Sequence, residues 1–407
     1  MKKPQARAIN DNTIILPAYA AKKLGLSKNA RLDIVAMRGR LEILPDIHSL
    51  SRLYIEPTSR CNISCRTCIR QTWNEPQGDL SRENFKRILA ELPGFPHLDS
   101  VMLGGFGEPT AHPDIIRMVS ALKKAGLNTE MVSNGTLLDA GMRDGLLKAG
   151  LDRLWISFDG ADDTTFERTR QGARFREVVE NIKPLRGKLE LGIAFVVTRA
   201  NFNDLKNLGW LAKKTGAEFI SVSNVIPYSP EMEKQMVCSL AIRSGCMSNA
   251  PGGTAVDIPR IDLNDFTRNT LWSLANGNQT ISLMGTPLGA PIDRCRFIRE
   301  RCTFIRWDGK VAPCMALMHS HKIHIHSAER HNKSHSFGDI TKRGLNAIWN
   351  SKDYVSFREK VSEFNFSPCH ACGGCSYSGD NTEDCGGNLH PATCGGCLWA
   401  QGVIQCP

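Results

Sequence analysis

Apolar and polar residues follow two distinct patterns between about residues 52 and 225. Short apolar runs bounded by turn residues predict buried strands, and segments with an apolar residue every three or four positions predict amphipathic helices. Helices are expected, for example, at 83–92 and at 113–126, where Pro113 suits a first turn and Gly126 an end. The six predicted strands are 53–56, 100–103, 129–132, 153–157, 191–197 and 219–223.

The order of these elements predicts the fold class. Strands that alternate with helices at this spacing form a parallel sheet in an α/β architecture, and six strand–helix units suit a (β/α)6 partial TIM barrel. In barrels of this kind the functional site lies at the C-terminal ends of the strands. The loops that follow the predicted strands are therefore the places where binding residues are expected.

Residues 1–48 have a separate pattern that predicts a small β module. A short strand ends at Pro17, a helix is closed by Gly25, and two strands flank residues 38–40, which is a hairpin signal. This order resembles the AbrB-like swapped-hairpin domain, whose members dimerise and bind DNA. The segment has no dense basic patch, so we expect docking or dimerisation rather than DNA binding.

The 407-residue chain carries 51 Lys and Arg against 41 Asp and Glu, a net charge of +10 that is spread along its length. We interpret this surplus as weak attraction to acidic partners or anionic cofactors. The N-terminus lacks the apolar core of a signal peptide, and the longest apolar runs, such as 193–197, are too short to span a bilayer. Because the chain has fifteen cysteines, we expect metal ligation in a reducing compartment, hence a cytoplasmic protein without membrane contact.

Three of these cysteines, Cys61, Cys65 and Cys68, follow the first predicted strand with the spacing Cys-x3-Cys-x2-Cys. Thiolates this close together can hold three corners of a cubane iron–sulfur cluster, which leaves one iron open for a small molecule. A structural zinc ion needs four ligands, and this loop offers no fourth Cys or His. Zinc and free thiols are the alternatives, and the spacing favours an iron–sulfur cluster.

This spacing resembles the radical S-adenosylmethionine (SAM) superfamily. The resemblance implies that the three cysteines bind a catalytic 4Fe–4S cluster whose open iron chelates SAM. It also implies that one electron, from a low-potential donor such as ferredoxin, splits SAM into methionine and a 5′-deoxyadenosyl radical, which removes hydrogen from a substrate. The chain differs from many members in having Thr67, instead of a bulky apolar residue, before the third cysteine.

The loop after the second predicted strand, 104–113, is rich in glycine. Glycine allows the backbone to approach a ligand closely. The loop resembles the Gly-Gly-Glu-Pro motif that contacts the amino group of SAM in the superfamily, which implies that role for the GxGEP form present here. A tight turn between strand and helix is the alternative interpretation. The matching residues are Gly105, Gly107, Glu108 and Pro109.

Short polar side chains also follow the third and fourth predicted strands. The resemblance implies that Asn134, Ser157 and Asp159 contact the ribose or the methionyl carboxylate of SAM, although turn and helix capping explains the same residue types. Arg170 matches a position where relatives often have an Arg-Gly pair, and its guanidinium suits a carboxylate. Gln171 departs from that pair. No acid, base or hydrogen donor for catalysis can be assigned.

The segment from residue 295 onward holds ten cysteines. Cys295, Gly309 and Cys314 have the spacing that opens a SPASM domain, with a hairpin predicted over 306–314 and a helix within 337–361. That resemblance implies one or two auxiliary 4Fe–4S clusters. The tail departs from the usual spacing, and Cys-x2-Cys pairs also form zinc ribbons. The candidate ligands are Cys295, Cys314, Cys369, Cys372, Cys375, Cys385, Cys394, Cys397 and Cys406.

Two other stretches are interpreted without a ligand. Cys238 and Cys246 are expected to be buried thiols. Six histidines lie between His319 and His335, and their spacing matches no ligand motif. We expect this histidine-rich stretch to be a solvated polar connection, with a substrate or metal loop as the alternative.

The ending at 390–407 completes a further resemblance. Together with the cysteine loop, the GxGEP loop and the AbrB-like start, it resembles the tungsten-cofactor oxidoreductase radical SAM maturases. The resemblance implies a maturase that modifies a tungstopterin oxidoreductase of the aldehyde ferredoxin oxidoreductase type, or its cofactor. The alternatives are a SPASM maturase of a ribosomally made peptide and a redox-responsive DNA-binding regulator. We expect an AbrB-like module at 1–48, a radical SAM partial barrel at 49–235, and a bridging region with a SPASM-like domain at 236–407.

Overall fold

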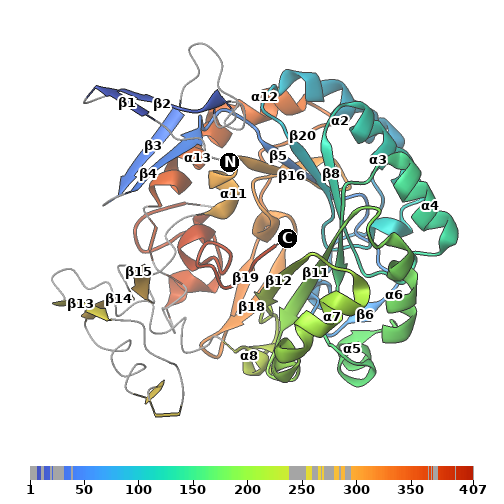
Figure 1. The fold of residues 1–407 in the computed structure, drawn as a ribbon. Coiled ribbons are helices and arrows are strands. Elements are labelled where there is room, and N and C mark those ends of the chain that lie inside the picture. Colours follow the sequence, from blue (N-terminus) through green and yellow to red (C-terminus); the bar gives the residue numbers. More distant parts are fainter. Residues whose placement is uncertain are drawn as a thin grey trace.

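The computed structural model has the expected α/β architecture (Figure 1). It describes residues 40–237 and 295–406, except 365, 368, 370–374 and 390, together with short stretches within 7–37 and 254–288. Cys238, Cys246 and Cys372 lie outside the described residues, so their predicted roles stay predictions.

One nine-stranded sheet organises the described residues, in the order β12-β11-β9-β8-β7-β5-β16-β17-β20. The run from β12 to β16 is parallel, whereas β17 and β20 are antiparallel to their neighbours. The strands are β5 (Arg52–Ile55), β7 (Ser100–Leu103), β8 (Asn128–Ser133), β9 (Arg153–Ser157), β11 (Glu190–Val197), β12 (Phe219–Asn224), β16 (Cys302–Ile305), β17 (Lys310–Ala312) and β20 (Gly338–Asp339).

The six strands predicted from the sequence are confirmed, each within one residue at either end. All four residues of β7 are buried, and burial on both faces of a parallel sheet explains why such strands appear as continuous apolar runs. Helices form an arc over the outer face of these strands in Figure 1. They are α2 (Arg82–Glu91), α3 (Ile115–Lys124), α4 (Ala140–Ala149), α5 (Asp163–Thr169), α6 (Phe175–Ile182) and α7 (Leu208–Thr215).

The helix ends follow local chemistry. Ser81 caps α2 by accepting a hydrogen bond from an N–H of the first turn. The helix predicted over 113–126 is α3, which begins two residues after Pro113 because Asp114 takes the N-cap position. Gly126 follows the end of α3 with a φ of +82°, a left-handed conformation that glycine adopts without strain.

The cysteine-rich C-terminal part extends the barrel sheet, which the sequence did not predict. β16 pairs in parallel with β5, from Cys302 opposite Arg52 to Ile305 opposite Ile55. All four residues of β16 are buried, so this strand needs cover on both faces and a neighbour for its backbone. The first strand of the barrel therefore has a C-terminal strand at its side.

The elements after β16 agree in part with the prediction. β16 and β17 form the hairpin expected over 306–314, and Gly309 has a φ of +91° at its turn. The single helix expected within 337–361 is instead two helices, α12 (Leu345–Trp349) and α13 (Lys352–Glu363). The break occurs because Ser351 takes the N-cap position of α13 in extended conformation.

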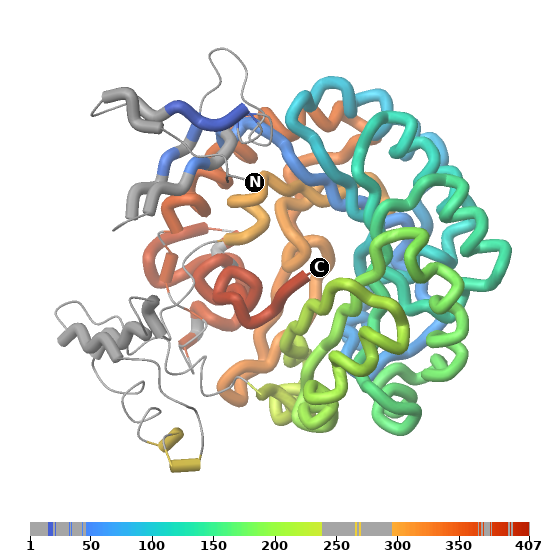
Figure 2. Tube along the Cα trace, in the orientation of Figure 1, coloured from blue at the N-terminus to red at the C-terminus, as the bar shows by residue number. Residues whose placement is uncertain are grey.

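A second apolar core fills the inside of the sheet. It joins barrel residues such as Tyr54 to C-terminal residues such as Phe304 and Trp399, and the rings of Tyr54 and Phe304 stack with centroids 4.3 Å apart. Figure 2 shows the red end of the chain inside the ring of barrel elements. The Val403 carbonyl accepts a hydrogen bond of 2.9 Å from the Asn224 amide, at the end of β12. C-terminal residues thus contact both the first and the last barrel strand.

The segment that leads into β5 is held by C-terminal helices. Arg358, on α13, donates from Nε to the Ile47 carbonyl at 3.0 Å and lies 3.6 Å from the ring of Trp349. Trp349 donates from Nε1 to the His48 carbonyl at 2.7 Å.

Throughout the described part of the chain, no helix has both the length and the apolar character that crossing a membrane requires.

Near the N-terminus, two antiparallel pairs are described. β1 (Arg7–Asn10) pairs with β2 (Thr13–Ile15), and β3 (Leu32–Met37) pairs with β4 (Arg40–Pro45) as the hairpin predicted around 38–40. Most of the predicted helix that ends at Gly25 lies outside the described residues. The AbrB-like character of this module and the domain boundaries stay predictions.

Candidate active site

The cysteine loop follows β5, at the C-terminal end of the barrel strands. Cys61, Cys65 and Cys68 line a pocket of about 590 Å³. Within the loop, β6 (Ser64–Cys65) pairs in antiparallel fashion with β10 (Arg170–Gln171), which places Cys65 opposite Arg170. The pairing holds the three thiols against the segment that follows α5.

The electrostatic surroundings of these thiols favour a bound cation. Burial raises the pKa of the Cys65 thiol to about 11 and also raises that of Cys68. The nearby Arg170 guanidinium lowers the pKa of Cys65, but burial outweighs it. Thiols in such surroundings keep their protons unless a positive charge compensates the thiolate. The iron of a cluster supplies that charge, so the donor set fits the predicted group.

The GxGEP loop contacts the cysteine loop so closely that a side chain at Gly107 would clash. A Cβ atom there would lie 2.1 Å from the Thr58 carbonyl oxygen and 2.7 Å from that of Arg60. The next N–H, of Glu108, donates to the Arg60 carbonyl at 2.7 Å. Pro109 follows at the start of a buried 3-10 turn. Gly107 is therefore required by close approach of two backbones, not only by turn geometry.

Glu108 fixes this loop to the end of β8. Its buried carboxylate accepts hydrogen bonds from the Thr110 N–H at 3.0 Å, the Ser133 hydroxyl at 2.8 Å and the Asn134 N–H at 2.7 Å. The Asn134 side-chain amide donates to the side-chain Oδ1 of Asn62 at 2.9 Å and lies 3.8 Å from the Cys61 sulfur. The structure thus brings two predicted residues, Glu108 and Asn134, beside the cysteine loop.

Two other predicted residues form an ion pair with each other. Arg170 and Asp159 are both buried and lie 2.9 Å apart, and Asp159 also accepts from the Val196 N–H at 2.9 Å. The Arg170 Nε is buried and has no hydrogen-bond partner among the described residues. Ser157, at the end of β9, is half-buried beside Ala194 of β11. The Arg170 Nε–H is therefore a donor without an acceptor in the described residues, although Arg170 does not itself line the cysteine pocket.

Sequence analysis missed a buried histidine beside this site. The stretch 319–335 is not a solvated connection, because it contains a hairpin of β18 (His321–Ile325) and β19 (Ala328–Asn332). The side chains of His319 and Glu56 are fully buried, and His319 contacts both Glu56 and Glu75. The alternation of polar and apolar residues over 321–325 was a strand signal, whereas the burial of His319 had no local signal.

Comparisons with known proteins distinguish between the interpretations of this site. Residues 55–208 match the family model of the radical SAM superfamily, and residues 295–376 match that of the SPASM iron–sulfur cluster-binding domain. A tungsten-containing aldehyde ferredoxin oxidoreductase cofactor-modifying protein from Pyrococcus furiosus is 30% identical over 372 residues, which cover 87% of this chain and 96% of that protein. The chain belongs to the radical SAM superfamily.

Other relatives of this radical SAM enzyme match over a smaller region. An AdoMet-dependent heme synthase from Methanosarcina barkeri is 29% identical over 175 residues, which cover 42% of this chain and 50% of the synthase. A PqqA peptide cyclase from Gluconobacter oxydans is 27% identical over 179 residues, which cover 43% of this chain and 49% of the cyclase.

Two solved structures share the fold. Streptococcus suis SuiB bound to the precursor peptide SuiA has a TM-score of 0.54 at 16% identity, over 81% of this chain and 70% of that chain. Native anSMEcpe with bound AdoMet has a TM-score of 0.52 at 17% identity, over 79% of this chain and 86% of that chain. The expected radical SAM barrel with a SPASM domain is confirmed.

The cofactors of this radical SAM enzyme follow from its two domains. The radical SAM domain implies a 4Fe–4S cluster and SAM, and the SPASM domain binds auxiliary iron–sulfur clusters. Cys61, Cys65 and Cys68 would hold the catalytic cluster. No three Cys, His, Asp or Glu side chains in the described ranges converge as they would around a single metal ion. A cubane holds its thiolates farther apart, one at each iron.

Four C-terminal cysteines interact electrostatically. Burial raises the pKa of Cys295, Cys314, Cys394 and Cys397, and negative charge on Cys295 and Cys397 would raise the pKa of the other two further. Cys394 and Cys397 lie beyond the residues that match the SPASM family model. Four thiols that oppose one another's ionisation require a compensating cation, which the iron of an auxiliary cluster would supply.

The remaining predicted ligands differ from one another in their exposure to solvent. Cys369 and Cys375 are half-buried, and Cys385 is exposed. Cys406 is half-buried, and its sulfur accepts a hydrogen bond of 3.3 Å from Trp399 Nε1. Cys302, which was not predicted as a ligand, is buried within β16. The assignment of these cysteines to a second auxiliary cluster stays a prediction.

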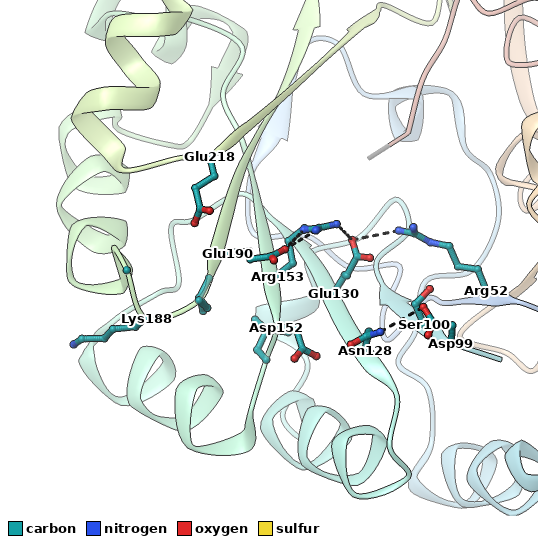
Figure 3. A pocket seen from close by; sticks show the side chains of 13 residues that line it. Arg52, Asp99, Ser100, Asn128, Glu130, Asp152, Arg153, Lys188, Glu190 and Glu218 are labelled. Atoms are coloured by element: carbon teal, nitrogen blue, oxygen red, sulfur yellow. Dashed lines mark hydrogen bonds and ion pairs between the residues drawn. The ribbon is translucent and has the colours of Figure 1, made fainter. Parts of the chain in front are cut away.

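A larger pocket, of about 770 Å³, lies at the opposite end of the barrel, around the N-terminal ends of the strands. Arg52, Arg153, Glu130 and Glu190 are paired with one another there, whereas Lys188 and Glu218 have no partner among the side chains drawn (Figure 3). Glu130 accepts from Arg52 at 3.3 Å, from Arg153 at 3.4 Å and from Trp155 Nε1 at 3.3 Å. In barrels of this kind catalysis takes place at the C-terminal ends of the strands, and the N-terminal end contributes to stability. We therefore assign this pocket a structural role.

Proposed function

We propose that this radical SAM enzyme modifies a tungsten-containing oxidoreductase or its tungstopterin cofactor. The observation that carries the proposal is the extent of the match to the cofactor-modifying protein of Pyrococcus furiosus, which includes 96% of that protein. The heme synthase and peptide cyclase relatives match over about half of their length, as expected where only the radical-generating part is shared. A relative that aligns over nearly its whole length supports a similar function more strongly than relatives that share only the radical-generating part.

The residues of the site would bind and orient SAM. When bound, the cluster and SAM supply a 5′-deoxyadenosyl radical. Gly107 lets the GxGEP loop lie against the cysteine loop, and Glu108 ties that loop to the end of β8 by accepting hydrogen bonds from Ser133 and Asn134. The free Nε–H of Arg170 would donate to a carboxylate such as that of SAM. Asn134, Ser157 and Asp159 keep their proposed roles around the ligand.

The partners in this proposal are a protein substrate and an electron donor. The net charge of +10 suits an acidic surface on the oxidoreductase, because complementary charge speeds encounter. A low-potential donor such as ferredoxin would provide the electron. The use of many cysteines as metal ligands supports a cytoplasmic location, since thiols stay reduced there. Because the chain is an enzyme of this superfamily, DNA binding by residues 1–48 would be an additional role.

A peptide substrate is the second candidate. It is supported by the relationship to the PqqA peptide cyclase, at 27% identity over 179 residues. The chemistry at the cluster would be the same, and the two candidates differ only in what receives the radical. A substrate assay therefore separates them better than any variant of the site.

The test uses the anaerobically reconstituted, reduced enzyme with SAM. We expect the tungsten-containing oxidoreductase, added in its apo or cofactor-loaded form, to raise 5′-deoxyadenosine formation above the rate without substrate. This stimulation should weaken with salt, because exposed charges are screened beyond about 10 Å at 0.1 M ionic strength. No stimulation by the oxidoreductase, together with stimulation by a short peptide, would replace the first candidate with the second.

A further inference from the structure

The contact between the barrel and the SPASM domain contains a histidine whose two ring nitrogens both face carboxylates. His319 Nε2 lies 3.0 Å from the nearer oxygen of Glu56, and Nδ1 lies 2.8 Å from Glu75. The side chains of His319 and Glu56 are fully buried. A carboxylate only accepts hydrogen bonds, whereas a neutral imidazole can donate from one nitrogen only. The geometry is therefore satisfied in full only by the imidazolium form.

The surrounding charges favour the same form. Burial alone would lower the pKa of His319, but its hydrogen bonds to Glu56 and Glu75 outweigh burial and raise it. Burial would raise the pKa of Glu75, but the bonds from His319 and the Ser320 N–H, with the charge of Arg306, lower it to about 2. Arg306 also pairs with Asp308, which Lys310 approaches from the solvent side.

The charged and titratable groups around the imidazole come from several elements, and they include His321 of β18, whose pKa burial lowers to about 4. Glu56 directly follows β5, Glu75 follows the cysteine loop, and the β16–β17 turn contributes Arg306 and Asp308. Three carboxylates are thus balanced by one guanidinium, one exposed lysine and the imidazolium. The two aromatic neighbours of the ring carry no charge: Trp73 stacks on His319 at 4.1 Å and Phe106 presents its edge at 6.0 Å.

Glu56 connects this histidine to the GxGEP loop. Its carboxylate accepts a hydrogen bond of 3.3 Å from the Phe106 N–H. Gly105 lies so close to Glu56 that a Cβ atom would be 2.7 Å from the Glu56 Cγ. A displacement of the Glu56 side chain must therefore move the backbone between Gly105 and Gly107, which is the part of the loop that approaches the cysteine loop.

Glu75 and Trp73 connect the same histidine to the segment after Cys68. The Ser320 N–H donates to Glu75 at 2.8 Å, so the backbone of the SPASM domain also holds this carboxylate. One side chain from the SPASM domain thus restrains both loops that form the SAM pocket, and its carboxylate partners lie more than 240 positions earlier in the chain.

We propose that His319 is a positioning residue through which the SPASM domain sets the shape of the SAM-binding loop. Without its donor, Glu56 would be a buried carboxylate short of a partner, and such groups rearrange or take up a proton because an unpaired buried charge is costly. The Phe106 N–H and the adjoining glycines follow that rearrangement. The role concerns SAM, so it is independent of which substrate the enzyme modifies.

The experiment compares His319→Gln with His331→Gln in the full-length reconstituted holoenzyme. Glutamine can donate toward one carboxylate but carries no charge. His331 belongs to the neighbouring hairpin and contacts Glu329 at the surface, with 56% of its side chain exposed. The probe is SAM alone, and the readouts are the KM for SAM in 5′-deoxyadenosine formation, kcat, and the SAM-dependent change in the electron paramagnetic resonance signal of the reduced cluster.

We expect His319→Gln to raise the KM for SAM by about tenfold or more, corresponding to at least about 1.4 kcal/mol. The spectroscopic titration should shift to higher SAM by the same factor, while kcat at saturating SAM and the iron content stay close to those of the parent. His331→Gln should change none of these readouts. Glu75→Gln keeps the Glu56 contact and should give a smaller shift in the same direction.

Three outcomes would overturn the proposal. One is an unchanged KM and spectroscopic titration in His319→Gln. Another is the same shift in His331→Gln, which would make the effect general to the hairpin. The third is loss of cluster iron in both His319→Gln and Glu75→Gln, because the residue would then support folding rather than the SAM loop. If only His319→Gln loses iron, the KM for SAM of Glu75→Gln is the deciding measurement. A raised KM supports the proposal, and an unchanged KM overturns it.

Discussion

The two ends of the barrel satisfy their polar groups in different ways. At the N-terminal ends of the strands, Glu130 is shared by Arg52, Arg153 and the Trp155 indole, although the buried Arg52 Nε has no hydrogen-bond partner in the described residues. At the C-terminal ends, Arg170 retains a buried Nε without a partner in the described residues. Burial also raises the pKa of the Cys65 thiol there to about 11.

This difference separates a structural pocket from a binding pocket better than pocket size does. Among the described residues, the larger pocket, of about 770 Å³, is lined by charged side chains and no thiol, whereas the smaller one, of about 590 Å³, is lined by three thiols whose ionisation a bound cation would compensate. Proteins depart from the ordinary rules of packing and polar pairing mainly at functional sites. The buried thiols therefore mark the site, because guanidinium nitrogens without a partner in the described residues occur at both ends of the barrel.

The largest expected effect comes from removing the thiols at one end and a carboxylate at the other. Replacing Cys61, Cys65 and Cys68 together with Ala should reduce 5′-deoxyadenosine formation to background, because no ligand remains for the catalytic cluster. Glu130→Gln should leave SAM cleavage intact but lower the free energy of unfolding by about 3 kcal/mol, since a buried ion pair is broken. Product analysis and denaturant unfolding measure the two effects.

The triple cysteine variant and Glu130→Gln test the C-terminal and the N-terminal end of the barrel separately. Circular dichroism should show that the triple cysteine variant remains folded. If that variant still cleaves SAM, the catalytic cluster is misassigned. If Glu130→Gln loses cleavage without loss of stability, the N-terminal pocket contributes to function after all.

Iron content tests how the cysteines are divided between the barrel and the SPASM domain. With the catalytic cluster and two auxiliary clusters filled, iron should approach about twelve per chain, four for each cubane. The triple cysteine variant should keep about eight and stay brown. Replacing Cys394 and Cys397 should also remove about four irons, but from an auxiliary cluster. Stoichiometric zinc with iron near four in the unmodified enzyme would instead indicate a zinc ribbon.

Gly107 and Gly209 provide a smaller and more local comparison. Gly107→Ala would place a methyl group 2.1 Å from the Thr58 carbonyl oxygen, whereas a Cβ at Gly209, on α7, would meet nothing within 4 Å. We expect Gly107→Ala to raise the KM for SAM by about tenfold. Gly209→Ala should leave KM unchanged and stabilise the helix by about 0.5–1 kcal/mol. Equal KM values in the two variants would contradict the argument from close approach.

Much of the barrel could be predicted from the sequence because its signals are local. Strands buried on both faces appear as short apolar runs, and those at 100–103 and 153–157 were predicted to the residue. The spacing of Cys61, Cys65 and Cys68 likewise fits within one loop. Both signals depend on residues a few positions apart in the sequence, so they can be recognised without knowledge of the fold.

The missed features depend on contacts between distant residues. The four buried residues of β16 could be recognised as a strand, but their pairing with β5 could not. Asp159 and Arg170 were predicted as separate SAM contacts, whereas they contact each other. The burial of His319 depends on distant partners such as Glu56, which directly follows β5 and lies 263 positions earlier. Polar residues in a histidine-rich stretch look solvated until such a partner is known.

The smallest expected effect, on pH dependence, sharpens the comparison of the two ends. The pKa of His319 is raised above its ordinary value of 6.5. Below pH 6.5 the ring is therefore protonated and makes both ionic contacts. They are lost as the pH rises through the raised value. We therefore expect the KM for SAM to be constant at low pH and then to increase, by at most about tenfold per pH unit for one proton.

Variants assign this transition to His319. Glu75→Gln removes a carboxylate that stabilises the imidazolium, so the increase in KM should begin at lower pH. His319→Gln should remove the His319 transition and leave only the ionisation of SAM itself, which both proteins share. Glu130→Gln, at the opposite end of the barrel, should not move it. A profile in His319→Gln that superimposes on that of the parent would show that this imidazole does not control SAM binding.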